Sequence, residues 1–130
     1  MRILGIDYGK KRVGLAISDE TGSVAFPYKV LSNNKDLVKD VGNVCKEENV
    51  GLVVIGASRT LSGKDNPIMK EIKSFKDRLL QELYLDIQLE PEFFSTVEAT
   101  RFQKETAYVD ASAAAIILQR YLDKPGSQGV

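Results

Sequence analysis

The pattern of apolar residues changes sharply near residue 33, and this change limits the folds available to the chain. Before it, three apolar segments rich in strand-forming residues are separated by short polar turns. Strands joined by such turns pair with their neighbours as an antiparallel meander. We therefore expect strands at residues 2–8, 13–18 and 24–31. Pro27 lacks a backbone N–H, which predicts an edge position or a bulge in the third strand.

After residue 33 the pattern alternates between helical spacing and short apolar runs. Glycines bound the continuous apolar run at 51–56, which is typical of a buried parallel strand. The segments expected to be helical are 34–48, 67–84, 95–103 and 109–122, and those expected to be strands are 51–56 and 86–90. Three antiparallel strands followed by two parallel ones, with helices packed on them, predict an α/β fold with a mixed five-stranded sheet. Right-handed crossovers then place the later strands beside the first.

The length of 130 residues fits one domain, which we expect to span residues 1–123, with a flexible tail at 124–130. No apolar run approaches the roughly 20 residues of a membrane span, and the opening residues read as a strand instead of a secretory signal. The single cysteine, Cys45, excludes an internal disulfide. These features predict a cytoplasmic protein with no membrane partner.

The absence of histidine removes several kinds of catalytic chemistry. It excludes a histidine general base, a Ser-His-Asp triad and a histidine-ligated zinc site. Carboxylates, lysines, hydroxyls and hard cations remain, and Mg2+ and Mn2+ prefer oxygen ligands. The net charge is zero, with 18 Lys and Arg against 18 Asp and Glu, so nucleic-acid binding would depend on local basic patches.

Carboxylates occur at three distant positions that the expected fold could bring together. Asp7 ends the first strand, where its side chain would project into open space at the sheet edge or cap a hairpin turn. Glu90 ends the expected fifth strand and Glu92 follows it, and Glu90 could also be a solvated charge. Asp110 begins the last helix, a position that the helix dipole also favours for Asp. The alanine-rich sequence after it would let this helix lie close to the sheet.

Three converging carboxylates would repel each other unless a cation lies between them. Mg2+ or Mn2+ would supply that charge, and either one or two ions fit the residues. Two ions roughly 3.5–4 Å apart can stabilise the attacking and leaving oxygens of an in-line phosphoryl displacement. The basic residues that would form a phosphate-binding rim around such a site, or would be only solvated turn charges, are Lys10, Lys11, Arg12, Arg59, Lys64, Arg101 and Lys104.

Several segments resemble the YqgF family, small relatives of the RuvC Holliday-junction resolvases, over roughly residues 1–123. Residues 6–19, IDYGKKRVGLAISD, are similar to the family's opening D-x-G-x-x-R-x-G-x-A signature. Residues 53–56 with Ser62 and Gly63 resemble its middle segment, and residues 110–122, DASAAAIILQRYL, resemble its closing segment. The resemblance implies a ribonuclease H-like fold, a divalent metal cofactor (Mg2+ or Mn2+), and catalytic, metal-binding carboxylates at Asp7, Glu92 and Asp110.

The sequence departs from the family around Glu92. The family has Asp and Arg on either side of this glutamate, where this chain has Pro91 and Phe93. Residues 57–59, Ala-Ser-Arg, also replace the family's Leu-Pro. Without that arginine, the chain lacks one of the family's contacts to substrate, which we expect to weaken substrate binding and with it activity.

The resemblance implies a metal-dependent nuclease with nucleic acid as its partner, and two roles follow. We favour processing of the 5′ end of pre-16S rRNA in ribosome biogenesis over cleavage of four-way (Holliday) DNA junctions. Junction resolution needs two sites in a stable dimer, and only the Ile and Leu residues of the last helix suggest a dimer surface, so a monomer and a homodimer both stay open. Three other readings are a non-catalytic RNA- or ribosome-associated module, an ATP-binding domain of the actin and hexokinase kind, and a purely structural α/β domain.

Overall fold

The computed structural model describes residues 1–59, 68–93 and 107–124. Its strands and helices are β1 (Arg2–Tyr8), β2 (Arg12–Ser18), β3 (Ala25–Ser32), α1 (Leu37–Glu47), β4 (Val50–Arg59), α2 (Met69–Glu82), β5 (Asp86–Phe93) and α4 (Ala107–Asp123). The short helix expected at 95–103 lies outside the described residues. None of the helices in the described part is long and apolar enough to cross a membrane.

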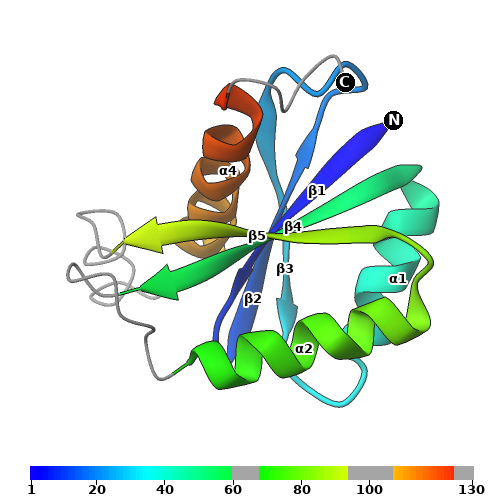
Figure 1. Ribbon diagram of the computed structural model, residues 1–130, viewed down its shortest axis with the longest axis vertical. Helices are drawn as coiled ribbons and strands as arrows, with labels where there is room; N and C mark the ends of the chain where they lie inside the picture. The colour runs from blue at the N-terminus through cyan, green and yellow to red at the C-terminus, as the bar shows by residue number, and fades with distance from the viewer. Residues whose placement is uncertain (60–67, 94–106, 125–130) are drawn as a thin grey trace.

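The five strands form one mixed sheet in the order β3-β2-β1-β4-β5. The pairs β1–β2 and β2–β3 are antiparallel, whereas β1–β4 and β4–β5 are parallel. Helices α1 and α2 cover one face of the sheet and α4 lies on the other (Figure 1). The predicted α/β fold, with three antiparallel strands followed by two parallel ones, is therefore confirmed. Strand β1 is central, so its carboxyl end lies in the middle of one edge of the sheet.

Strand β3 is an edge strand, as Pro27 predicted. Its pairing with β2 shifts register where Leu15 and Ala16 face Lys29 and Pro27, so one residue of β3 bulges out of the ladder. Both expected features are present because a proline cannot donate the hydrogen bond that a regular interior strand requires.

Strands β4 and β5 extend beyond the ends expected at residues 56 and 90. Their parallel pairing continues through Ser58 with Glu92 and Arg59 with Phe93. Pro91 is tolerated inside β5 because that strand also lies at an edge of the sheet. Glu92 therefore belongs to the strand and does not follow it.

Alternate residues of β1 contribute to two separate cores, because side chains of a strand point to opposite faces of the sheet. Leu4, Ile6 and Tyr8 pack in the larger core, under α1 and α2. Ile3 packs on the opposite face with α4 residues Ala114, Ile117, Leu118 and Leu122. The direction in which each β1 side chain points is thus fixed by two packed layers.

Helix α4 lies against β1 at Gly5. A Cβ atom added there would lie 2.7 Å from the Cβ of Leu118 and 3.2 Å from the carbonyl oxygen of Ala114. Ala111, Ala113 and Ala114 are all buried on this helix. The prediction that the alanine-rich helix packs closely on the sheet is confirmed, and the absent side chain of Gly5 makes that approach possible.

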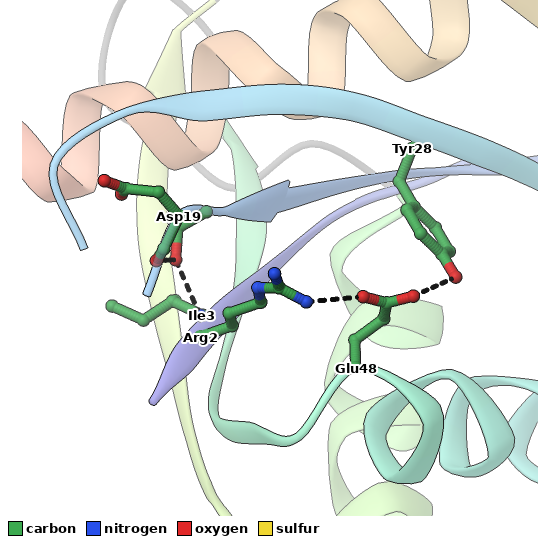
Figure 2. Close-up of polar contacts among 6 residues, drawn as sticks. Arg2, Ile3, Asp19, Tyr28 and Glu48 are labelled. Carbon is green, nitrogen blue, oxygen red and sulfur yellow. Dashed lines mark hydrogen bonds and ion pairs between the residues drawn. The ribbon is translucent and has the colours of Figure 1, made fainter. Parts of the chain in front are cut away.

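Polar contacts fix the amino end of β1 (Figure 2). The Arg2 guanidinium donates to Glu48 Oε1 at 2.7 Å, and the Tyr28 hydroxyl donates to Glu48 Oε2 at 2.9 Å. The backbone N–H of Ile3 donates to Ser18 Oγ at 2.8 Å. Burial first, and then the bond to Glu48, raise the pKa of Tyr28. These contacts join β1 to β2, β3 and the end of α1.

The Asp19 carboxylate organises the turn between β2 and β3. It accepts hydrogen bonds from the Thr21 hydroxyl at 2.6 Å and from the backbone N–H groups of Ser23 at 2.8 Å and Val24 at 3.1 Å. These bonds, with that of Thr21 the strongest influence, lower the pKa of Asp19 from 3.8 to about 2. Asp19 thus has a local structural role at the edge of the sheet that also carries the amino end of β1.

Replacing Gly5 with alanine tests the close approach of α4. We expect Gly5→Ala to lower the free energy of unfolding by about 1–3 kcal/mol, because overpacking forces backbone or side-chain shifts. Gly42→Ala is the control: its Cβ would meet only the end of the Leu83 side chain, at 3.1 Å, and alanine favours a helix. Chemical denaturation of both variants measures the difference, and equal stabilities would contradict the packing argument.

Replacing Asp19 with asparagine tests its role in the turn. A carboxyl group whose pKa is lower in the folded state stabilises the fold above its unfolded pKa, and that contribution disappears as the pH falls. We expect Asp19→Asn to melt below the wild type at pH 7, and the gap to close between about pH 4 and pH 2. Circular dichroism melts would measure the gap, with Glu20→Gln as a control in the same turn. A gap independent of pH would show that ionisation of Asp19 is irrelevant.

Candidate active site

Asp7 lies near the carboxyl end of the central strand β1, opposite Gly14 of β2. Its neighbours Ile6 and Tyr8 point into the core under α1 and α2, so Asp7 faces the α4 side together with Gly5. Only 5% of Asp7 is exposed to solvent. The expectation that its side chain projects into open space is therefore wrong.

The burial of Asp7 has a chemical meaning. Aspartate is seldom buried unless hydrogen bonds, an ion pair or a bound cation compensate for the loss of water. A buried carboxylate on a central strand also has little freedom to rotate, which is the condition for a well-positioned ligand or catalytic group. Asp7 is thus a stronger candidate for a functional carboxylate than its place in a hairpin indicated.

Strand β5 carries the two glutamates considered for the site. Glu90 pairs with Gly56 of β4 and is 4% exposed, so the reading of Glu90 as a solvated charge is wrong. Its carboxylate accepts a bond from Lys124 Nζ at 2.6 Å, just beyond the end of α4. Glu92 pairs with Ser58, one strand period further along. The side chain of Glu92 lies outside the described residues.

The ion pair between Glu90 and Lys124 joins β5 to α4. Half of the Lys124 side chain is solvent-exposed, whereas the Glu90 side chain is almost fully buried. No local pattern indicates this pair, because 34 residues separate its members. Lys124 is the first residue of the expected flexible tail, and it forms this ion pair. The other residues of that tail, 125–130, lie outside the described residues.

Helix α4 carries the third predicted carboxylate. Asp110 lies in its first turn, and Ala114, one turn later, is buried against the sheet at Gly5. The backbone of Asp110 is therefore part of the helix that packs on the Asp7 face of β1. Its side chain lies outside the described residues, so its distance from Asp7 stays a prediction.

The predicted basic residues fall into two groups. Lys10 and Lys11 are exposed in the turn between β1 and β2, directly after Asp7 and Tyr8, and the half-buried Arg12 begins β2. Arg59 ends β4, and its backbone is described but its side chain is not. Lys64, Arg101 and Lys104 lie outside the described residues.

Within the described side chains, no three carboxylate or thiolate groups gather as a ready metal site. Two members of the predicted ligand set, Glu92 and Asp110, are not among those side chains. Cys45 is buried, and that burial raises the pKa of its thiol to about 11, so it stays protonated at neutral pH and is a poor ligand there.

A depression beside the carboxyl end of β1 was not anticipated. It is lined by Tyr8 and by the α2 residues Lys70, Glu71, Ser74 and Arg78. The spacing of four residues between Lys70, Ser74 and Arg78 is the sequence signal that could have indicated a common helix face.

The arrangement of the elements is a ribonuclease H-like fold. T. thermophilus RuvC, solved in complex with a Holliday junction substrate, is similar with a TM-score of 0.56 and 15% identity, over 94% of this chain and 93% of that one. Fowlpox virus resolvase, solved with Holliday junction DNA, gives a TM-score of 0.53 and 13% identity over 95% of this chain and 100% of that one. At these identities the likeness defines the fold: a RuvC-like, ribonuclease H-like domain.

Sequence comparison identifies the family within that class. The profile of the RuvX family, described as Holliday junction resolvase, matches residues 1–124. The "Putative pre-16S rRNA nuclease" of Ehrlichia canis is 38% identical over 133 residues, covering 94% of this chain and 85% of the relative. The protein of the same name in Maridesulfovibrio salexigens is 35% identical over 132 residues, covering 94% and 98%. The chain belongs to the RuvX (YqgF) family, which confirms the resemblance found in its motifs.

Replacing Lys124 tests the link between α4 and β5. We expect Lys124→Ala to lower the free energy of unfolding by about 1–3 kcal/mol, because it leaves a buried carboxylate without its charged donor. Chemical denaturation measures the loss, and Lys124→Arg, which keeps the charge, should recover most of it. Combined with Glu90→Gln in a double-mutant cycle, the two losses should be less than additive. Strict additivity would show that the pair contributes nothing to stability.

Proposed function

We propose that this chain is a metal-dependent nuclease that hydrolyses phosphodiester bonds and processes the 5′ end of pre-16S rRNA. The observation that carries the proposal is the buried Asp7 at the carboxyl end of the central strand, in a chain of the RuvX family. Carboxyl ends of parallel strands are where open α/β sheets usually bind their ligands. The names of the relatives supply the choice of rRNA as substrate.

Asp7, Glu92 and Asp110 are the proposed catalytic and metal-binding residues. Strand alternation supports Glu92, because Ile87 and Leu89 pack in the core under α1 and α2, which leaves even-numbered β5 residues for the face of Asp7. Helix geometry supports Asp110. Figure 1 shows α4 and β1 running in roughly opposite directions, so the turn before Ala114 lies toward the carboxyl end of β1.

The donor chemistry of these residues fits Mg2+ or Mn2+. All three offer carboxylate oxygen, the ligand that these hard cations prefer, and the chain has no histidine to favour a softer metal. When bound, the metal would stabilise negative charge on the reacting phosphate. The chain itself would hold Asp7 rigidly between two layers and exclude bulk water from one side of it.

Basic residues beside the carboxylates would position the substrate backbone. Lys10 and Lys11 are exposed in the turn that follows β1. Their ammonium groups can contact phosphate oxygens there and, being cations, do not compete with the carboxylates as metal ligands. We assign the same role to the rest of the predicted rim: Arg12, Arg59, Lys64, Arg101 and Lys104. Phe93, which stands where the family has arginine, cannot share it.

Cleavage of four-way DNA junctions is the second candidate. The description of the family favours it, and the activity would require a homodimer with two symmetric sites. The rRNA role works with a monomer as well and would place the protein in the cytoplasm with the ribosome precursors. The two roles share one site and differ in substrate, so one assay can separate them.

The test is cleavage of labelled RNA carrying a 16S precursor 5′ leader, with a four-way DNA junction in parallel, in Mg2+, Mn2+ or EDTA. We expect metal-dependent RNA cleavage that Asp7→Asn lowers by at least about 100-fold, since even outer partners of metal ligands are worth 10- to 100-fold. Asp86→Asn is the matched control, because Asp86 is exposed at the far end of β5.

The outcomes divide the candidates. Junction cleavage without RNA cleavage would replace the rRNA role by the resolvase role. RNA binding without cleavage of either substrate would indicate a binding module that has lost its chemistry. Cleavage that persists in EDTA or in Asp7→Asn would refute the carboxylate–metal site.

A further inference from the structure

The depression beside β1 combines residues of two distant segments. It has a volume of about 230 Å³ and lies between Tyr8, at the end of β1, and the α2 residues from Lys70 to Arg78. Lys70, Ser74 and Arg78 follow each other at intervals of four residues and so line it from one helix face. In Figure 1 the first turns of α2 lie next to the carboxyl end of β1.

Tyr8 is the β1 residue that lines this depression. It is 7% exposed, and its ring packs on Phe75 with the ring centroids 5.0 Å apart. Among the described residues, no hydrogen bond to the Tyr8 hydroxyl is present. The Tyr8 oxygen is not among the buried, partnerless polar atoms of the described side chains, so the hydroxyl is open to solvent and can donate to a group in the depression.

The charged residues of the depression are also available to a ligand. Lys70 and Arg78 are exposed, and within the described part of the chain neither side chain forms an ion pair or a hydrogen bond. With the carboxylate of Glu71 they leave a net charge of +1. Ammonium, guanidinium and hydroxyl donors suit phosphate oxygens, and a net charge of +1 matches a phosphodiester better than a dianionic phosphate.

The depression lies close to the proposed active site. Tyr8 directly follows Asp7, so their Cα atoms are about 3.8 Å apart, but the two side chains face opposite sides of the sheet. Lys10 and Lys11 are exposed in the turn that follows. A nucleic-acid strand lying across this edge of the sheet would meet the carboxylate on the α4 side and the depression on the α2 side.

We propose that the depression formed by Tyr8, Lys70, Ser74 and Arg78 binds a backbone phosphodiester of the same nucleic-acid strand that reacts at Asp7. The inference rests on the proposed nuclease function and adds to it a second contact, on the α2 side of the sheet. RNA and DNA share this group, so the site contributes affinity and strand direction but no base sequence.

Equilibrium binding without catalysis tests the site. Fluorescence anisotropy would follow the labelled RNA leader and the four-way DNA junction in EDTA over a series of salt concentrations. The test variants are the double substitution Lys70→Ala with Arg78→Ala, and Tyr8→Phe, which keeps the ring on Phe75. The control is Lys39→Ala with Lys46→Ala, which removes two exposed charges from α1.

We expect the double variant to bind RNA about 10-fold more weakly, as the loss of charge-assisted hydrogen bonds implies. Its slope of log K against log salt should fall by about 0.7, the value for one phosphate of a single strand. Tyr8→Phe should bind about 3-fold more weakly with an unchanged slope, because it removes a neutral donor. The control should match the wild type in slope, and a phosphate monoester should compete poorly for the site.

Other outcomes would overturn the proposal. Equal affinity and slope in all variants would do so while leaving the nuclease function intact. A loss of binding that coincides with a changed oligomeric state in sedimentation would make the depression a contact between two copies. A wild type that binds neither nucleic acid would remove this site and the proposed function together. RNA binding that depends on the depression, without cleavage that depends on Asp7, would support the phosphodiester-binding site and refute the nuclease function.

Discussion

The contact between α4 and β1 at Gly5 is the constraint on which the geometry of the site depends. The helix can approach the strand because Gly5 has no side chain, and Leu118 with the backbone of Ala114 takes up that space. Asp7 lies two residues further along the same face and is buried. A larger residue at position 5 would separate the helix that carries Asp110 from the strand that carries Asp7.

The remaining structure holds β1 in place from its other face and from its amino end. Ile6 and Tyr8, on either side of Asp7, are packed under α1 and α2, so the strand cannot rotate without exposing apolar surface. At the amino end, Arg2 is held by Glu48, which Tyr28 also binds (Figure 2). The carboxylate is thus presented by a strand that is packed on both faces and tied at its start.

The sequence was sufficient for the parts of the fold that depend on local patterns. The meander, the parallel strand at 51–56 and the alanine-rich last helix all follow from periodicity and turn residues, and Pro27 correctly marked an edge and a bulge. The predicted ends of β4 and β5 were too early, because the pairing between the two strands sets where they end. That pairing includes Pro91, which is tolerated because β5 is an edge strand.

The candidate site was less accessible to local reasoning. Asp7 was found by its position after an apolar strand, but its burial is a matter of tertiary packing, and α4, which packs on the same face of β1 at Gly5, lies about a hundred residues further along the chain. Glu90 looks like a surface charge in sequence, and only the approach of Lys124 explains why it can be buried. The depression at Tyr8 was missed for the same reason, because its other residues come from α2. Contacts between distant segments are the common element in these misses.

The positions of the charged residues in the fold matter more for nucleic-acid binding than the zero net charge of the chain. In the described part, exposed cations lie in the turn after β1, at Lys10 and Lys11, and on α2, at Lys70 and Arg78, whereas others, such as Lys39 and Lys46, lie on α1. At the edge of the sheet that carries the amino end of β1, Asp19 is bound within its turn and Glu48 is paired with Arg2. Because binding of nucleic acid depends on the local field and not on the total charge, a chain with zero net charge can still present a basic edge to a phosphate backbone. Asp7 lies near the carboxyl end of β1, at the same edge of the sheet.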